Sequence, residues 1–155
     1  MLRSGSLLLS RAVSRTSTGD TLSCSRGLKN LLGATMTDLN CPSEDLQDMG
    51  FRAGAFEPGT CALKGYVISD ANGAKTGIWE CSPGTFEFPN RPNLESIVIL
   101  KGKVKLTNME DETSMTLVRG DAAVLEIGSS VRWEVLETTR KFYVIAPPNM
   151  TMPEN

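Results

Sequence analysis

The chain has 155 residues, of which 40% are hydrophobic and 22% are charged, the composition of one ordinary globular domain. No stretch approaches the roughly 20 consecutive apolar residues that would span a bilayer, so no membrane span is expected. The net charge is −2, but residues 1–35 carry five basic side chains and one acidic side chain, a charge of +4 that leaves −6 on residues 36–155. Because nucleic-acid binding depends on Lys and Arg that neutralise phosphates, this acidic body argues against a nucleic-acid partner.

Residues 1–35 are rich in Ser, Thr and Arg, and Leu2, Leu8 and Leu9 could share one face of a helix. This is the composition of an organelle transit peptide. We therefore expect a mitochondrial protein, with a plastid address, or a cytoplasmic protein with a disordered leader, as the alternatives. Residues 36–49 are expected to form a linker.

From residue 50 onward, short apolar or alternating segments are separated by turns rich in Gly, Pro and Asn. Helix signals are almost absent, apart from one possible turn over residues 45–49. The predicted strands cover residues 51–56, 66–69, 76–81, 95–100, 103–107, 114–117, 122–127, 131–135 and 141–145. Many short strands at near-regular spacing indicate an all-β antiparallel sandwich or barrel, here over residues 50–148, followed by a tail over residues 149–155.

The segment over residues 95–100 is apolar on both faces, apart from Glu95 at its start and the small Ser96. That pattern predicts a strand that is covered on both sides, and residues 122–127 show the same pattern. A carboxylate that opens such a strand is costly to bury alone, so Glu95 needs a partner or a ligand.

The order of these segments resembles a cupin, with Glu95 and Gly102 separated by six residues and followed by Gly120-Asp121 and Gly128. More closely, the chain is similar to the cupin family named for (S)-ureidoglycine aminohydrolase, which also contains the ethanolamine-utilisation cupins. The residues that carry the closer likeness are Gly77-Ile78-Trp79-Glu80-Cys81, Pro83-Gly84, Glu95, Gly102, Gly120-Asp121, Gly128, Trp133-Glu134-Val135 and Arg140-Lys141-Phe142-Tyr143-Val144. The resemblance covers about residues 50–146 and implies a jelly-roll β-barrel (a double-stranded β-helix) and a homodimer.

The chain departs from this family at the metal ligands. Metal-binding cupins place two histidines before the motif-one Glu and a third after the motif-two Gly. Here those positions hold Pro89 and Arg91, or Phe88 and Asn90 with the longer spacing, and Val131. The chain has no histidine, and its four cysteines form no CxxC pair and are expected to be reduced. Because transition-metal sites usually need three protein ligands, we expect no metal and no cofactor, and the metal-dependent aminohydrolase activity is not carried over.

The alternation of a strand places Glu95, Ile97 and Ile99 on one face, and the match to the cupin ligand position turns Val131 and Trp133 inward. Glu95 is expected to pair with Lys141 or Arg91. Lys141 and Tyr143 share one face of the last predicted strand, but the sequence does not decide whether that face is the inner one. The candidate ligand-binding residues are Trp79, Arg91, Glu95, Trp133, Lys141 and Tyr143.

Three functions stay open at this point. The first is a metal-independent cupin that binds a small polar metabolite, a polar amine or a carbohydrate-derived acid, with Glu95 as the anchor. The second is a non-catalytic subunit of an organelle complex, in which Glu95 and Lys141 form a buried ion pair that only fixes strand register. The third is a metal-free isomerase or lyase with Glu95 as general base and Tyr143 as hydrogen-bond donor. The carboxylates of Glu80, Glu87 and Glu126 are expected to be solvated or to stabilise turns.

Overall fold

The computed structural model describes residues 37–147. The predicted leader over residues 1–35 and the predicted tail over residues 149–155 lie outside the described residues, so both stay predictions. Within the described part, no helix is long and apolar enough to cross a membrane. The elements are the short 3-10 helix η1 (Ser43–Asp45) and the strands β1 (Gln47–Phe51), β2 (Ala62–Ala71), β3 (Ala74–Cys81), β4 (Gly84–Phe88), β5 (Leu94–Asn108), β6 (Ser114–Val118), β7 (Ala122–Leu125) and β8 (Val131–Ala146).

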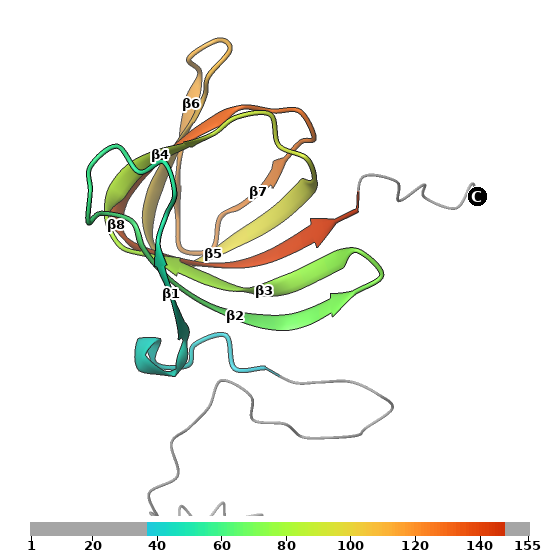
Figure 1. The fold of residues 1–155 in the computed structure, drawn as a ribbon. Helices are drawn as coiled ribbons and strands as arrows, with labels where there is room; N and C mark the ends of the chain where they lie inside the picture. The colour runs from blue at the N-terminus through green and yellow to red at the C-terminus, as the bar shows by residue number, and fades with distance from the viewer. Residues whose placement is uncertain (1–36, 148–155) are drawn as a thin grey trace, which may run out of the picture.

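All strand pairs are antiparallel, and the strands follow one another in the order β1-β2-β3-β8-β5-β6, with β4 on β8 and β7 on β5. The long strands β5 and β8 pair with each other along both of their halves. Their register shifts between Ile99 and Val104, and such bulges bend a sheet. The strands therefore curve around a common interior (Figure 1), which confirms the predicted all-β barrel.

Two predicted strand breaks are absent. Residues 95–100 and 103–107 belong to the single strand β5, and residues 131–135 and 141–145 belong to the single strand β8. Gly102 takes a φ of +82°, which fits a bulge and lets the chain bend without ending the pairing. The predicted first strand over residues 51–56 is also wrong, because β1 ends at Phe51.

The prediction that β5 and β7 are covered on both faces is wrong. Ile97 is 1% exposed, but its neighbour Val98 is 38% exposed, and Val124 on β7 is 55% exposed. The buried and exposed positions alternate instead, so the outer faces of β5 and β7 are open in the described part of the chain. Apolar composition on both faces therefore did not reveal whether a cover was present.

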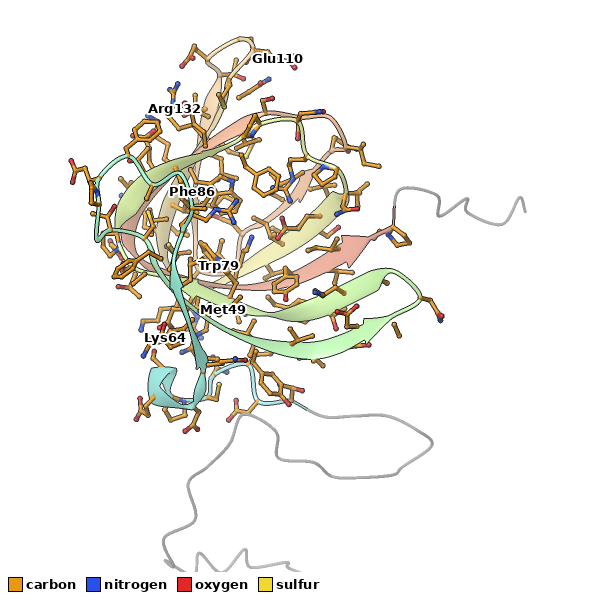
Figure 2. The ribbon with its side chains drawn as sticks, in the orientation of Figure 1. Met49, Lys64, Trp79, Phe86, Glu110 and Arg132 are labelled. Atoms are coloured by element: carbon orange, nitrogen blue, oxygen red, sulfur yellow. The ribbon has the colours of Figure 1, made fainter. Side chains whose placement is uncertain are left out.

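The main core fills the interior of the barrel. In Figure 2, Trp79 and Phe86 lie within the curve of the strands, whereas Glu110 and Arg132 lie at the periphery. The buried residues of this core are Cys61, Leu63, Cys81, Phe86, Ile97, Ile99, Val104, Leu106, Leu117, Leu125, Val131, Trp133 and Val135. The inward orientation predicted for the β5 and β8 residues is therefore confirmed.

Residues 39–46 lie against the outer face of β2 and β3, where Cys41 and Leu46 are buried and pack against Ile78. The segment predicted as a linker over residues 36–49 is thus partly packed on the barrel, and it also supplies the start of β1. The free thiols of the described chain are those of Cys61 and Cys81, but Cys41 is disulfide-bonded, so the prediction of reduced thiols is wrong for Cys41.

The same segment explains a second correction, at Glu80. Its side chain is buried rather than solvated, and Glu80 Oε2 accepts hydrogen bonds from Arg140 Nε at 2.9 Å and from Ser43 Oγ at 3.0 Å. Arg140 also donates to the carbonyl oxygen of Cys41. Glu80 was expected in water because the sequence does not show that residues 39–46 fold back over β3.

Candidate functional site

A cavity of about 270 Å³ opens into the barrel and is called the barrel pocket below. At roughly 30 Å³ per molecule, this space would hold about nine waters, so it suits a small metabolite. The residues that line it are Gln47, Met49, Arg52, Gly65, Tyr66, Val67, Ile78, Trp79, Phe86, Phe88, Arg91, Pro92, Asn93, Glu95, Trp133, Lys141, Tyr143 and Ile145. All six predicted ligand-binding residues are among them.

The register of β3, β8 and β5 brings the predicted residues together. Lys141 on β8 lies between Trp79 on β3 and Ile99 on β5, and two residues further on, Tyr143 lies between Gly77 and Ile97. Because side chains two apart on a strand share a face, Lys141 and Tyr143 both face the pocket. The orientation that the sequence left open is therefore inward.

Gly77 leaves the space that Tyr143 occupies. A Cβ atom at position 77 would lie 2.6 Å from the Tyr143 hydroxyl and 2.5 Å from the carbonyl oxygen of Tyr66. Since neither distance is possible without a shift, any larger residue here would displace the tyrosine ring. Gly77 is thus one of the residues that position the predicted site.

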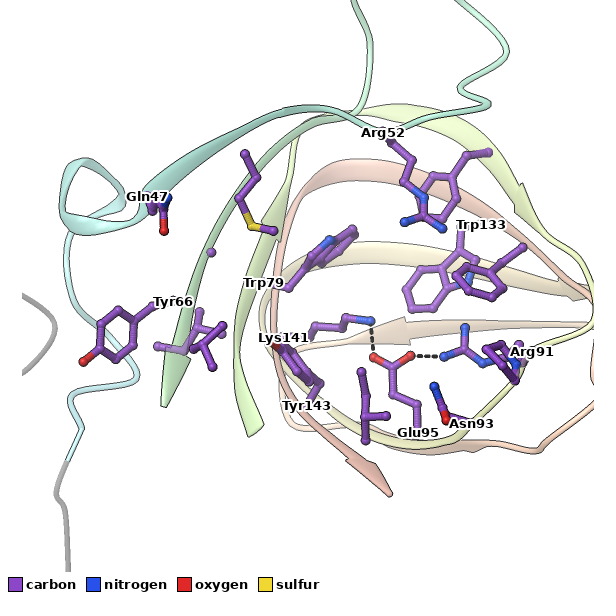
Figure 3. A pocket seen from close by; sticks show the side chains of 18 residues that line it. Gln47, Arg52, Tyr66, Trp79, Arg91, Asn93, Glu95, Trp133, Lys141 and Tyr143 are labelled. Carbon is purple, nitrogen blue, oxygen red and sulfur yellow. Dashed lines mark hydrogen bonds and ion pairs between the residues drawn. The ribbon is translucent and has the colours of Figure 1, made fainter. Parts of the chain in front are cut away.

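Glu95 lies between two cations (Figure 3). Lys141 Nζ donates to Glu95 Oε1 at 2.7 Å, and the guanidinium of Arg91 donates to Glu95 Oε2. All three side chains are less than a tenth exposed. The predicted pairing of Glu95 with Lys141 or Arg91 is therefore confirmed, and both cations take part.

The backbone around Arg91 is held in place by the turn that precedes β8. The Arg91 N–H donates to the carbonyl oxygen of Ser129 at 2.9 Å, and the Arg91 carbonyl accepts from the Gly128 N–H at 2.7 Å. These two bonds tie the loop before β5 to the turn before β8. Arg91 therefore reaches Glu95 from a fixed backbone, which reduces the conformational entropy that the ion pair must overcome.

Burial and charge act in opposite directions on this cluster. Burial raises the pKa of Glu95, but Lys141 and Arg91 outweigh it and hold the pKa of that carboxyl below its ordinary value. For Lys141, burial together with the charges of Arg91 and Arg52 lowers the pKa below its ordinary value, although Glu95 raises it. Glu95 is therefore ionised at neutral pH, and a carboxylate held by two cations is a weak general base.

Aromatic rings form the wall above the ion pairs. Trp79 and Trp133 meet edge to face at 5.9 Å, and Phe86 stacks on Trp133 at 5.8 Å. Lys141 Nζ lies 4.5 Å from the ring centre of Trp133 and 4.8 Å from that of Trp79, within the range of cation–π attraction. The two tryptophans thus hold the ammonium group in place, and Trp79, which is only partly buried, presents apolar surface to the cavity.

Several lining residues were missed by the sequence analysis. Arg52 follows β1 and stacks on Phe86 and Phe88, with its guanidinium carbon 4.9 Å and 5.0 Å from the two ring centres. Phe86 and Phe88 could have been found, because they alternate with the outward Glu87 on β4. Arg52 had no such signal, since its segment was assigned to the wrong strand.

Comparison with known proteins agrees with this architecture. Residues 68–143 match the family model of the EutQ-like cupin domain. The chain contains a cupin domain. No curated protein sequence matches it.

Solved cupin structures share the fold at low sequence identity. The EutQ protein of Clostridium difficile superposes with a TM-score of 0.63 at 17% identity, over 84% of this chain and 99% of that one. A putative ethanolamine utilization protein of Salmonella typhimurium superposes with a TM-score of 0.62 at 18% identity, over 84% of this chain and 100% of that one. A DUF861-family protein of unknown function from Pseudomonas syringae superposes with a TM-score of 0.58 at 19% identity, over 79% of this chain and 51% of that one. At these identities the likeness concerns the fold alone.

The residues of this cupin do not fit a metal ion at the position where metal-binding cupins hold one. Val131 is buried and has no ligating atom, and both oxygens of Glu95 already accept from Arg91 and Lys141. A metal ion beside Glu95 would face these two cations at close range. Within residues 37–147 there is also no group of three His, Cys, Asp or Glu side chains that could hold a metal.

Proposed function

We propose that this cupin binds a small polar metabolite in the barrel pocket without a metal ion. Glu95, Lys141 and Arg91 form the polar anchor of the site, and Trp79 and Trp133 form its flat wall. The observation that carries the proposal is the cavity of about 270 Å³ that reaches this buried ion-pair cluster. Pockets that bind small molecules are typically apolar concavities with a few converging polar groups, as here.

The other two functions are less well supported. A purely structural role for the Glu95–Lys141 pair does not need a cavity beside it, whereas the binding role does. An isomerase or lyase with Glu95 as general base needs a carboxylate of raised pKa, but Lys141 and Arg91 hold the pKa of Glu95 low. Binding therefore makes the fuller use of the described geometry.

The proposal is tested on the full-length protein, treated with EDTA, against a panel of small carboxylates, amines and sugar acids. A compound that binds the pocket raises the melting temperature, since a ligand at about 100 times its Kd stabilises the folded state by about 2.7 kcal/mol. Titration calorimetry then gives its Kd for the wild type and for Glu95→Gln. We expect Glu95→Gln to change the Kd at least about tenfold, or ~1.4 kcal/mol, because it alters the charge of the polar anchor.

The matched control is Glu134→Gln, which removes a carboxylate paired with Lys105 on the outside of the barrel and should leave the Kd unchanged. If Glu95→Gln does not fold, Tyr143→Phe serves as the second pocket variant. A panel without any binding compound, or binding that appears only after a divalent metal is added, would contradict the proposal.

A further inference from the structure

The charges that line the barrel pocket do not balance. Arg52, Arg91 and Lys141 face a single carboxylate, that of Glu95, which leaves an excess of two positive charges. Glu95 is already engaged by Arg91 and Lys141. Among residues 37–147, Arg52 has no carboxylate within 4.0 Å, although its side chain lies partly inside the molecule. The pocket is thus positive inside a body that the sequence makes acidic.

Three hydrogen-bond donors in the same pocket have no partner among the described residues. They are Nε of Arg52, Nε of Arg91 and Nε1 of Trp133. Arg91 is 5% exposed and Trp133 is 2% exposed, and all three nitrogen atoms are buried. A buried donor without a partner costs about 1–3 kcal/mol, so this side of the pocket has more hydrogen-bond donors than acceptors.

The two guanidinium groups are close enough to act on one ligand. The guanidinium carbons of Arg91 and Arg52 lie 4.5 Å and 5.0 Å from the ring centre of Phe88, so they are at most 9.5 Å apart. This upper limit is close to the Debye length of about 8 Å at physiological salt. Burial, and after it the charge of Arg91, lower the pKa of Arg52, as expected for like charges that face each other without a counterion.

We propose that the occupant of the barrel pocket is a small organic carboxylate. Its anionic group lies between Arg52 and Arg91, and its flat apolar body lies against Trp133 and Trp79. This inference rests on the proposed function and names its ligand class. An amine would meet three cations, whereas a carboxylate compensates the charge and accepts from guanidinium groups in their favoured planar geometry.

The size of the ligand follows from the cavity. A space equal to about nine waters accepts a carboxylate with one ring or a short branched chain. Benzoate has this size and a flat body, and benzamide has the same shape without the charge. The difference in Kd between benzoate and benzamide therefore isolates the contribution of the negative charge to binding.

The experiment measures the Kd of benzoate, benzamide, benzylamine and phenyl phosphate with the full-length, metal-free protein at low salt. Benzoate should bind at least about tenfold more tightly than benzamide, and added salt should weaken benzoate more than benzamide. Arg52→Gln should remove most of the preference for benzoate over benzamide. Arg119→Gln, which removes an exposed arginine outside the pocket, is the matched control and should keep the preference.

The outcomes separate this inference from the proposed function. If benzamide or benzylamine binds as tightly as benzoate, the pocket binds small molecules but the carboxylate assignment is wrong. A clear preference for phenyl phosphate over benzoate also overturns the carboxylate assignment. If no probe and no compound of the metabolite panel binds, the proposed function itself fails. An unchanged preference in Arg52→Gln would remove Arg52 from the site.

Discussion

At the scale of single residues, the central feature is a carboxylate that holds two buried cations. Glu95 compensates Lys141 and Arg91 in a place where neither cation could stay charged alone at low cost. Removing one member of such a cluster leaves the others uncompensated, which is far more damaging than replacing the whole cluster. The fold therefore depends on Glu95 whether or not a ligand is bound.

We expect Glu95→Gln to lower the free energy of unfolding at neutral pH by about 3–5 kcal/mol. The deficit should shrink as the pH falls below about 5, because the folded pKa of Glu95 is below its ordinary value of 4.5. In that range the unfolded wild type takes up a proton that the folded form does not, so the wild type loses the contribution of Glu95 and the variant has none to lose. Denaturant titrations of both proteins across this pH range measure the difference. A deficit that stays constant or grows toward low pH would contradict the claim that ionised Glu95 stabilises the folded protein.

At the scale of elements, the bend of β5 decides where the site lies. The register shifts between Ile99 and Val104 let one strand contribute Glu95 to the open half of the barrel and Leu106 to its packed half. Gly102 lies in this bend with a φ of +82°, where a Cβ atom would collide with the Thr138 carbonyl group on β8. Close approach of two backbones, rather than the loop first predicted, requires glycine here.

Gly102→Ala is expected to lower the free energy of unfolding by about 3 kcal/mol or more, because a strained backbone and an overpacked contact add to each other. Gly120→Ala is the matched control, since Gly120 also has a positive φ, +95°, but has nothing within 4 Å of the added methyl group. It should cost only about 1–2 kcal/mol. Equal costs in the two variants, measured by urea denaturation, would show that the approach of β8 does not matter.

At the scale of the whole molecule, two buried ion-pair clusters lie on opposite sides of the β3–β8 pair. Lys141 and Glu95 face the barrel pocket, whereas Arg140 and Glu80 face outward beneath residues 39–46. Adjacent residues of one strand thus serve the two faces of the sheet. The outer cluster fastens the N-terminal segment of the described chain to the barrel.

Arg140→Gln should therefore loosen residues 39–46 and destabilise the protein by about 3–5 kcal/mol, because Glu80 would be left buried without its cation. Relative to the wild type, amide hydrogen exchange should accelerate more in residues 39–46 than in β5 and β6. Arg132→Gln on the same strand is the matched control, since Arg132 pairs with Glu87 and Glu112 at the surface and should change little. Unchanged exchange in residues 39–46 of Arg140→Gln would show that other contacts hold the segment.

The sequence by itself determined the all-β class and the shared face of Glu95 and Ile97, because the alternation of a strand and the glycines of its turns can be read from neighbouring residues. The barrel and the inward orientation of Trp133 followed from the resemblance to cupins. The sequence also indicated that Glu95 needed a cation, since an isolated buried carboxylate is too costly.

The tertiary structure alone decided which faces are covered and which distant residues meet. Glu80 was predicted in water, and Val98 was predicted beneath a cover, because burial on an outer face depends on whether another segment folds over it. Arg52 joined the pocket only because the chain after β1 crosses over Phe86 and Phe88. Alternation along a strand says which side chains point the same way, but the excess of positive charge in the pocket arises from residues far apart in the chain, and only their packing brings them together.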